Sequence, residues 1–549
     1  MTDVVIVGGG PRAMTLIERI GSLAQGPVEI TVVDDAELGV GRVWRVDQPR
    51  SVIMNAVAVD STMFFDESVT IDEAGHGGPA FFEWCHSEHA AALPEADLAA
   101  EAARVEPFTC VSRALYGAYL RWHAGEVLSG LPREVTVRQV RGCVTDIGPS
   151  GERWVTTVTA DDEVQQLDAT SVVMAIGWGQ TTPSNGPLST GAHVAAGSAI
   201  DQGLDAVQPG SRVLLRGLGL SFIDSVSLMT EARGGTFETA SADDRGRTVR
   251  LRYAPSGREP RIFAYSRSGV PFSAKPAWTG RPRIPAMPNL TRVAAEWDYS
   301  RPGDFETQLW PAIQADALRA YREAGGTDEL TSIDRSLPLQ NVTNYEAAVL
   351  DYLHADIDEC LAGEPSPLKA MHLALNAARP MLARFMRFDG LTPKGYADYR
   401  AFMRFVGLIG CVPPHWRNQQ LAALIEAGVV TLVREPVDAD TVVDARVLKP
   451  SPRQQAGLLS TLRRSGRATT YAVGGTLPTD ALRIDSRDGS VYGADGPQPG
   501  LYSVGIPSED QRGQTIFAPI PYADSDVFHE AHATASAVLA RIRTPERTP

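Results

Sequence analysis

The chain has few cysteines, no long apolar segment and no excess of positive charge, and each deficit excludes a class of protein. Its five cysteines are spread over 549 residues without a CxxC pair. That pattern argues against a disulfide framework or a zinc site and indicates reduced thiols in a cytoplasm. No apolar run approaches the roughly 18 residues of a membrane span. The net charge of -15 argues against a nucleic-acid partner, which needs a basic surface.

The sequence also offers few side chains in arrangements typical of catalysis. No Ser/His/Asp or Cys/His arrangement stands out, and a loose resemblance to a metal site around His354 is better explained by a solvated acidic helix. We therefore expect no bound metal ion. The chain is longer than one hydrophobic core usually requires, so two or three domains are expected. A strand that begins at residue 4 leaves no room for a secretory signal, and we expect a cytoplasmic protein.

The first forty residues have the pattern of a dinucleotide-binding βαβ unit. An apolar run at 4–7 precedes Gly8, Gly10 and Ala13, and a helical stretch, a second apolar run and Asp34 follow. Gly8 allows a tight turn, Gly10 lets the backbone approach a pyrophosphate, and the small Ala13 lets the helix pack close to the strand. The helix N-terminus offers free N–H groups to phosphates. Asp34 is placed to accept hydrogen bonds from ribose hydroxyls, so the pattern predicts a bound dinucleotide.

A second unit of the same kind lies far downstream. A candidate strand at 212–216 leads into Gly217, Gly219 and Ser221, and a helical stretch continues to about residue 233. This is again strand, Gly-x-Gly and helix, although Phe222 occupies the third position, where the fingerprint has a small residue. The unit predicts a second nucleotide site, with an ordinary βα turn as the alternative.

The strand after this second unit indicates which nucleotide binds there. The run at 261–265 ends in Ser266 and Arg267, where a NAD-specific site would have an acid. A hydroxyl and a guanidinium suit a 2′-phosphate, because arginine makes charge-assisted, bidentate contacts to phosphate. We therefore predict NADPH, with a solvent-exposed arginine as the alternative. The intervening residues 235–259 are typical of a hairpin, which we expect to close at 255–258.

Two units suggest two cofactors, and the first unit, with its acid at the ribose position, suits FAD. An apolar strand at 171–177 ends in a glycine, where two-dinucleotide flavoproteins cross between domains. A similar strand at 470–475 indicates a return to the first domain. A strand at 500–507, followed by a helix from about residue 525, resembles the end of an FAD domain.

We therefore expect an α/β fold with two Rossmann-like dinucleotide-binding domains, for FAD and NADPH, and a mainly helical insertion. Helical patterning recurs between residues 300 and 430 and is broken by proline and glycine. This insertion would cover an active-site cleft or mediate contacts in a homo-oligomer. The predicted parts are 1–185 (FAD domain, first part), 186–300 (NADPH domain), 301–430 (helical insertion) and 431–549 (return to both domains).

Six short motifs spread over nearly the whole chain carry a resemblance to a known family. They are GVGRVW at 39–44, MN at 54–55, RALYGAYL at 113–120, SGREP at 256–260, SRSGVP at 266–271 and GIP at 505–507. With them the chain resembles actinobacterial-type FAD/NAD(P)-binding proteins related to flavin N-hydroxylases and Baeyer–Villiger-type monooxygenases. The best-understood relatives with this layout are nitrosuccinate-forming aspartate N-hydroxylases of secondary metabolism.

The resemblance implies an enzyme that uses FAD, NADPH and O2 to oxygenate a small molecule. It also implies that Gly41 and Gly505 contact the flavin cofactor. Asn55 follows a segment that lines the flavin in such folds, so its amide is a candidate catalytic group that hydrogen-bonds the isoalloxazine. A loop-capping asparagine explains Asn55 equally well.

An acidic amino-acid substrate needs cationic partners, and one segment of this acidic chain supplies them. Lys275, Arg281 and Arg283 place three positive charges within nine residues, after the predicted NADPH strand. They are the candidate substrate-binding residues, with a solvated basic loop as the alternative.

The function we predict is FAD- and NADPH-dependent N-hydroxylation of a small amine or amino acid, with L-aspartate to nitrosuccinate as the leading reaction. A Baeyer–Villiger or S-oxidising monooxygenase would share every cofactor motif and differ only in its pocket. A non-catalytic FAD- or NADP-binding protein is the alternative of a different class. A flavin reductase fits less well, because the sequence has no cysteine pair to accept electrons.

Overall fold

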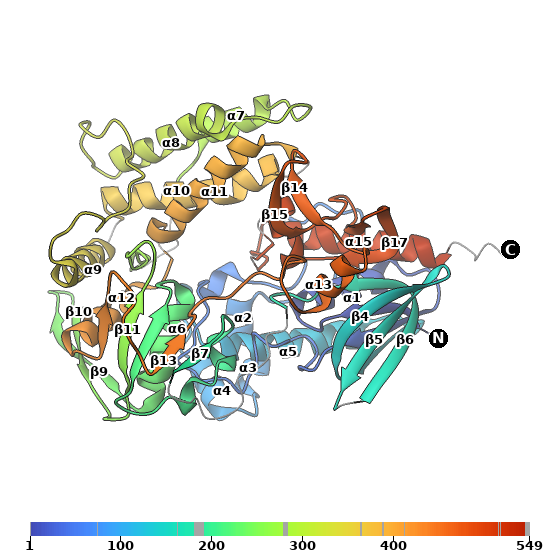
Figure 1. The fold of residues 1–549 in the computed structure, drawn as a ribbon, viewed down its shortest axis with the longest axis horizontal. Coiled ribbons are helices and arrows are strands. Elements are labelled where there is room, and N and C mark those ends of the chain that lie inside the picture. Colours follow the sequence, from blue (N-terminus) through green and yellow to red (C-terminus); the bar gives the residue numbers. More distant parts are fainter. Residues whose placement is uncertain are drawn as a thin grey trace.

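The computed structural model describes residues 2–73, 75–161, 163–179, 191–277, 284–362, 365–386, 389–410, 412–513, 515–516 and 518–543. Two modules lie side by side, one built on a mixed sheet with a parallel centre and one on a parallel sheet, and a layer of helices lies above them in Figure 1. The predicted α/β fold with two dinucleotide-binding sheets and helical regions is confirmed. The predicted domain boundaries stay a prediction.

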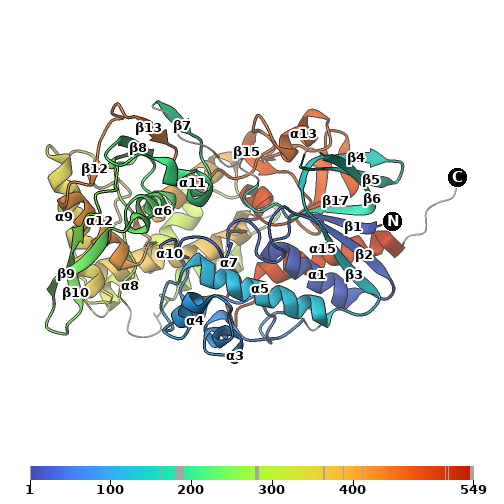
Figure 2. The ribbon, with the colours of Figure 1, turned by 90° about the horizontal axis from the view of Figure 1, so that it is seen from below.

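The first module, on the right in Figure 1, contains an eight-stranded sheet whose main path runs β16-β17-β6-β1-β2-β3. Alternate residues of β1 serve two cores: Val4 and Ile6 pack towards helices α1 and α15, whereas Val5 and Val7 pack towards strands β4 and β5 and helix α13. Both faces of the sheet are therefore covered, and α1 and α15 lie next to each other in Figure 2. The elements are β1 Thr2–Val7, α1 Pro11–Leu23, β2 Val28–Val33, β3 Val135–Val140, β4 Cys143–Ser150, β5 Arg153–Ala160, β6 Glu163–Met174, α13 Leu458–Arg464, β16 Ser490–Gly493, β17 Gly496–Ser503 and α15 Asp526–Arg543.

A group of helices extends this module and surrounds an aromatic cluster. Phe81, Trp84, Tyr116 and Tyr119 are buried against one another, with ring centroids 5.1 to 6.2 Å apart in the pairs that touch. The helices are α2 Phe81–Cys85, α3 Glu88–Ala91, α4 Ala96–Ala102 and α5 Arg113–Gly130. Because α5 also packs against the first sheet through Ala124 and Val127, this cluster is fixed to the sheet.

The second module has a five-stranded sheet in the order β12-β11-β8-β13-β7, in which all neighbours are parallel. The strands predicted at 212–216 and 261–265 have those bounds in the structure. Helices α6, α9 and α12 share one core with this sheet. The elements are β7 Ala192–Val194, β8 Arg212–Arg216, α6 Leu220–Met229, β9 Thr236–Ala242, β10 Thr248–Ala254, β11 Arg261–Tyr265, α9 Tyr345–Leu361, α12 His415–Glu426, β12 Val430–Leu432 and β13 Thr441–Val443.

The hairpin predicted within 235–259 forms, but its predicted turn is wrong. Strands β9 and β10 are antiparallel and turn at 243–247, whereas residues 255–258 connect β10 to β11. Asp243 builds the turn, because its carboxylate accepts hydrogen bonds from the backbone N–H groups of Arg245 and Arg247. Gly246, with φ +75°, supplies the left-handed residue that the turn requires.

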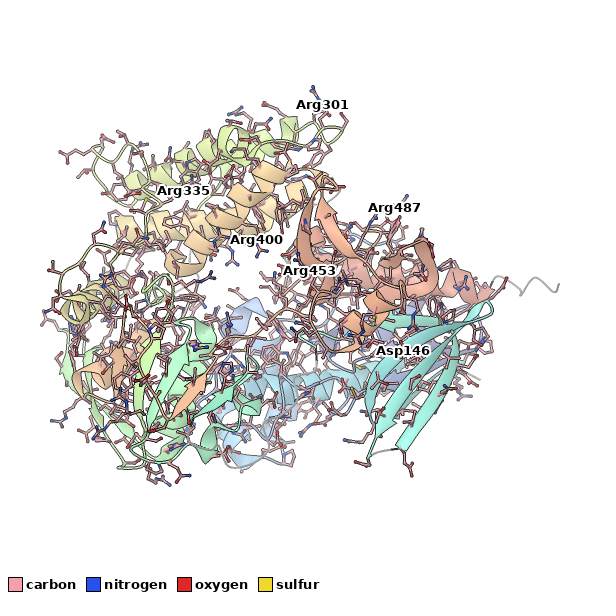
Figure 3. All side chains as sticks on the ribbon, viewed as in Figure 1. Asp146, Arg301, Arg335, Arg400, Arg453 and Arg487 are labelled. Carbon is pink, nitrogen blue, oxygen red and sulfur yellow. The ribbon has the colours of Figure 1, made fainter. Side chains whose placement is uncertain are left out.

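The helical layer consists of α7 Pro288–Glu296, α8 Trp310–Glu323, α10 Pro367–Met386 and α11 Pro393–Ile409. It packs on a hairpin of β14 Thr470–Val473 and β15 Leu477–Leu482, whose Tyr471 and Val473 enter the core of the layer. The strand predicted at 470–475 pairs with β15 outside the first sheet, and β16 and β17 join that sheet. The predicted return of 470–475 to the first domain stays a prediction. Arg400, labelled on α11 in Figure 3, pairs with Asp510 at 2.5 Å and links the layer to helix α14 Glu509–Arg512.

Candidate functional site

The turn between β1 and α1 has the shape that a dinucleotide requires. Gly8 has φ +100°, its N–H donates to the carbonyl of Val33 at 2.8 Å, and a Cβ there would lie 2.5 Å from the carbonyl oxygen of Ala175. Only glycine fits this position. A Cβ at Gly10, the residue before α1, would meet only the Cα of Gly41, at 4.0 Å. The N-terminus of α1 is therefore open for a phosphate to approach.

A cavity of about 590 Å³ begins at this turn. Five of the predicted cofactor-binding residues lie on its wall: Gly8, Gly10, Asp34, Gly41 and Gly505. Ala13 does not line the cavity and lies fully buried behind it, in the core between α1 and the sheet. Small residues at the helix end, a carboxylate on the wall and a cavity of this size fit an FAD molecule, and these residues would hold it.

Asp34 ends β2 and lies where a ribose is expected. Its carboxylate accepts hydrogen bonds from the N–H groups of Gly9 at 2.5 Å and Ala36 at 2.9 Å. Burial raises the pKa of Asp34 above its ordinary value, and these two N–H donors act in the opposite direction. Ribose hydroxyls that donate to this carboxylate would further favour its ionised form.

The turn after β8 repeats the geometry of the first turn. Gly217 has φ +137°, its N–H donates to the carbonyl of Tyr265 at 2.8 Å, and a Cβ there would lie 2.5 Å from the carbonyl oxygen of Ala445. Gly219 precedes α6 as Gly10 precedes α1, and Ser221 is half-buried in the first turn of α6. Gly217 fits the tight turn of a second dinucleotide site, whereas a Cβ at Gly219 would lie 3.1 Å from the ring of Phe272. A contact between Ser221 and a nucleotide stays a prediction.

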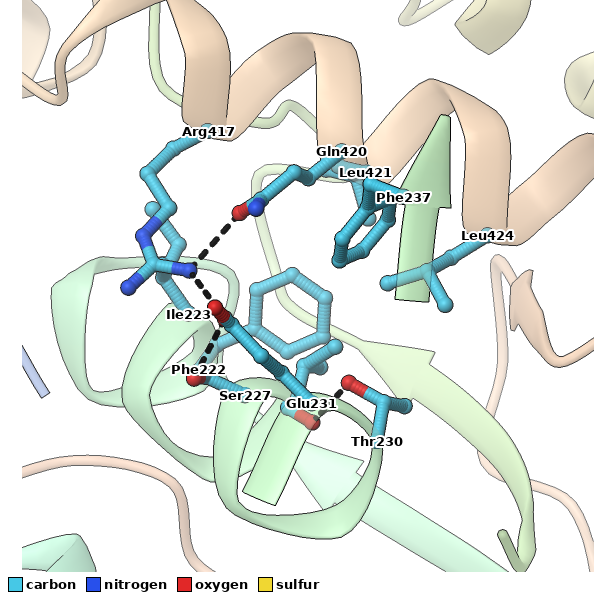
Figure 4. A pocket seen from close by; sticks show the side chains of 11 residues that line it. Phe222, Ile223, Ser227, Thr230, Glu231, Phe237, Arg417, Gln420, Leu421 and Leu424 are labelled. Atoms are coloured by element: carbon cyan, nitrogen blue, oxygen red, sulfur yellow. Dashed lines mark hydrogen bonds and ion pairs between the residues drawn. The ribbon is translucent and has the colours of Figure 1, made fainter. Parts of the chain in front are cut away.

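Phe222, which departs from the fingerprint, has a structural explanation. Figure 4 shows its ring between α6 and α12, near Phe237 of β9 and Leu421 of α12. The remaining cavity there is only about 20 Å³, so the large side chain fills space that the hairpin and α12 enclose. Arg417 closes one side through Gln420, at 2.7 Å, and Glu231. This cavity is too small for a cofactor.

The residues predicted to select NADPH follow β11. The hydroxyl of Ser266 accepts a hydrogen bond from the N–H of Gly269 at 3.1 Å and lies 3.0 Å from the hydroxyl of Ser268. Arg267 is exposed to solvent. This position at the end of a strand adjacent to β8 suits a 2′-phosphate contact, which stays a prediction.

The predicted catalytic residue and one predicted substrate-binding residue touch each other. The ammonium group of Lys275 donates to the side-chain oxygen of Asn55 at 3.1 Å and to the backbone carbonyl of Asn55. Neither residue lines the cavity beside α1. Arg281 and Arg283 lie outside the described residues. The roles assigned to all four stay predictions.

Charged contacts that the sequence analysis did not predict join the two modules. Arg113 of α5 pairs with Asp224 of α6 at 2.6 Å, and Arg45 pairs with Asp201 at 2.9 Å. Arg417 of α12 donates to the backbone carbonyl of Ser51. Burial raises the pKa of Asp224, which Arg113 opposes. These pairs fix one nucleotide turn relative to the other, and no local motif signals them because each joins distant parts of the chain.

Comparison with known proteins adds evidence on the family to which the chain belongs. A family profile described as FAD-NAD(P)-binding matches residues 5–179. An L-aspartate N-monooxygenase (nitrosuccinate-forming) of Streptomyces cremeus is 30% identical over 100% of this chain and 96% of its own. A protein of the same name from Streptomyces davaonensis is 28% identical over 98% and 97%. The chain thus aligns with these relatives from end to end.

Two solved structures are similar at much lower identity. An ornithine N-hydroxylase of Kutzneria sp. 744 is 14% identical with a TM-score of 0.41, over 98% of this chain and 99% of its own. The L-lysine 6-monooxygenase of Pseudomonas syringae is 14% identical with a TM-score of 0.43, over 99% of both chains.

Two further findings concern the described residues. They contain no group of three or more side chains suited to a metal ion. None of their helices combines the length and the apolar character that crossing a bilayer requires.

The two glycine turns and the end-to-end alignment with the Streptomyces relatives agree on one class of protein. FAD and NADP(H) are its cofactors, as predicted. The chain belongs to the FAD–NAD(P)-binding family, among the flavin-dependent, NADPH-using monooxygenases that hydroxylate nitrogen.

Proposed function

We propose that the substrate is L-aspartate and that the enzyme converts its amine to a nitro group, yielding nitrosuccinate. The single observation that carries the proposal is the 30% identity, over the whole chain, to the S. cremeus enzyme of that name. The family resemblance of the sequence motifs points the same way.

The position of Lys275 supports an acidic substrate. It comes from the segment after β11, yet its ammonium group reaches Asn55, in the loop of the first module that the resemblance places next to the flavin. A positive charge where the two modules meet suits a substrate carboxylate. Arg281 and Arg283, outside the described residues, would add to this charge.

A buried network holds the segment that carries Lys275. The carboxylate of Asp356 on α9 accepts hydrogen bonds from the N–H of Ala274 at 2.8 Å and the hydroxyl of Ser273 at 2.7 Å. Lys369 on α10 is 1% exposed, pairs with Asp356 at 2.6 Å and donates to the carbonyl of Ala274 at 2.8 Å. Such a network fixes the backbone next to Lys275, so its ammonium group is held in place before substrate arrives.

These positions indicate what the cofactors and the residues of the chain each contribute to the reaction. When bound, FAD reduced by NADPH activates O2 for transfer to a nucleophilic nitrogen. The residues of the chain bind, orient and shield: the glycine turns position the two nucleotides, and Lys275 holds a carboxylate.

The substrate amine must be unprotonated to act as a nucleophile, so the coupling of NADPH oxidation to product should improve as the pH rises towards the pKa of the amine.

The proposal is tested by measuring NADPH oxidation with product mass analysis over a panel of acceptors. Aspartate should accelerate NADPH oxidation and yield hydroxylamine or nitro products, whereas simple amines should not. Glutamate, ornithine, a cyclic ketone and a sulfide complete the panel. If aspartate gives only hydrogen peroxide at every pH while a ketone or sulfide is oxygenated, the aspartate assignment is wrong and a Baeyer–Villiger or S-oxidising activity replaces it.

A further inference from the structure

Arg12 is a charged residue on the cavity wall at the point where a diphosphate is expected. It is the second residue of α1, next to the open N-terminus at Gly10. The charged residues that line the cavity are Arg12, Arg42, Asp34 and Asp35. The two carboxylates follow β2, where the ribose is expected, so Arg12 and the carboxylates occupy different parts of one cavity.

Arg12 is held by the last helix of the first module, far away in the sequence. Its guanidinium donates to the carboxylate of Glu530 at 3.0 Å and to the backbone carbonyl of Thr515 at 2.5 Å. Among the described residues these two contacts use two of the five N–H donors of an arginine. The other donors remain available on a side chain whose orientation is already determined.

Glu530, 5% exposed, serves more than one partner. Besides Arg12 it binds a guanidinium N–H of Arg512 at 3.0 Å and accepts a hydrogen bond from the N–H of Gly505 at 3.0 Å. A Cβ at Gly505 would lie 3.6 Å from the Arg12 side chain, so Gly505 lies directly against Arg12. Glu530 therefore joins Arg12, α14 and Gly505, and two of these three line the cavity.

The charges around Arg12 point towards an anion in the cavity. Burial lowers the pKa of Arg12, Glu530 raises it, and Arg512 lowers it, with smaller raising effects from Glu509 and Asp526. Of these five charged groups, only Arg12 lines the cavity. A buried guanidinium that shares its carboxylate with a second guanidinium gains from a further anionic partner. A dinucleotide diphosphate at the N-terminus of α1 is such a partner.

We propose that Arg12 binds the diphosphate of FAD and that Glu530 is the positioning residue that aims it. The glycine turn alone would bind phosphate through backbone N–H groups. Arg12 adds a charge-assisted contact, and its dependence on Glu530 couples FAD binding to the docking of α15 and Gly505. The inference rests on FAD binding and not on the identity of the substrate.

Arg12→Met and Arg12→Lys test the contact, with Arg512→Met as the matched control. Each apoprotein is reconstituted with FAD, the Kd is measured by flavin fluorescence, and thermal unfolding is followed without FAD. Arg12→Met should weaken FAD binding roughly 10- to 100-fold, because one charge-assisted hydrogen bond is lost. Arg12→Lys should fall in between, since it keeps the charge without the planar fork. Arg512→Met should lower the Tm of the apoprotein and leave the Kd within about twofold.

Glu530→Gln separates positioning from charge. If the negative charge of Glu530 only repels the diphosphate, removing that charge should tighten FAD binding. If Glu530 aims Arg12, the variant should weaken FAD binding, and the double variant with Arg12→Met should bind no worse than Arg12→Met alone. The inference is overturned if Arg12→Met binds FAD like the wild type, or if Arg12→Met and Arg512→Met weaken it equally.

Discussion

The ammonium group of Lys275 lies 3.1 Å from the side-chain oxygen of Asn55, so a segment that follows the second nucleotide-binding unit contacts a loop of the first. The two residues are 220 positions apart in the chain. The proposed substrate site therefore forms where the modules meet.

Replacing Lys275 by methionine tests this site. If Lys275 binds a substrate carboxylate, the KM for the acidic substrate should rise roughly 10- to 100-fold, because a charged contact is lost. The rate of flavin reduction by NADPH in the absence of substrate should change far less. Stopped-flow reduction and steady-state kinetics separate the two effects. Lys394→Met is the control, because Lys394 is exposed and pairs with Asp398 on α11; equal effects of both variants would remove Lys275 from the site.

Gly8 and Gly10 should respond differently to substitution, although they lie two residues apart. Gly8→Ala should destabilise the apoprotein, because its Cβ would lie 2.5 Å from a backbone oxygen at φ +100°. Gly10→Leu should leave the Tm of the apoprotein nearly unchanged and abolish FAD retention, because its side chain would enter the cavity. Thermal unfolding without FAD and the flavin absorbance of the purified protein distinguish the two. A Gly10→Leu protein that retains FAD would contradict the assignment of the cavity.

Arg267 is predicted to select NADPH over NADH. Arg267→Ala should raise the KM for NADPH roughly 10- to 100-fold and leave that for NADH nearly unchanged, because only NADPH carries the 2′-phosphate. The kinetic constants for both coenzymes provide the measurement. Arg245→Ala, an exposed arginine at the hairpin turn, is the control. An equal loss with both coenzymes would place Arg267 outside the phosphate site.

One buried and two half-buried histidines predict acid sensitivity. Burial lowers the pKa of each to about 4: His123, His372 and His415. The unfolded chain takes up these protons near pH 6.5, whereas the folded chain does not until about pH 4. The free energy of unfolding should therefore be unaffected by these groups above pH 6.5. It should fall between pH 6.5 and 4, on the order of 3 kcal/mol for each histidine.

Urea unfolding at pH 7 and pH 5 measures this dependence. Replacing His372 by glutamine should make the decrease between the two pH values smaller, because one proton fewer is taken up on unfolding. The same decrease in both proteins would show that His372 is not responsible.

Local sterics explain why so much of the cofactor framework was predictable. The tight turn between a buried strand and a helix needs glycine for reasons of local backbone geometry, and the whole pattern lies within about ten residues of sequence. The strands at 212–216 and 261–265 accordingly appear with their predicted bounds, and Gly8 and Gly217 have the positive φ angles that the turn needs. Apolar patterning likewise predicted the helices between residues 300 and 430.

The sequence by itself therefore determined the two nucleotide turns and their strands, because each depends on residues that are neighbours in the chain. Motifs spread along the whole chain indicated the class of chemistry through a family resemblance. Only the tertiary structure decided which distant groups meet. It paired Arg12 with Glu530, 518 positions away, and it placed β14 in a hairpin with β15 that packs against the helical layer. Such contacts follow from the packing of whole faces of sheets and helices. A short segment of sequence does not indicate which distant segment it will contact.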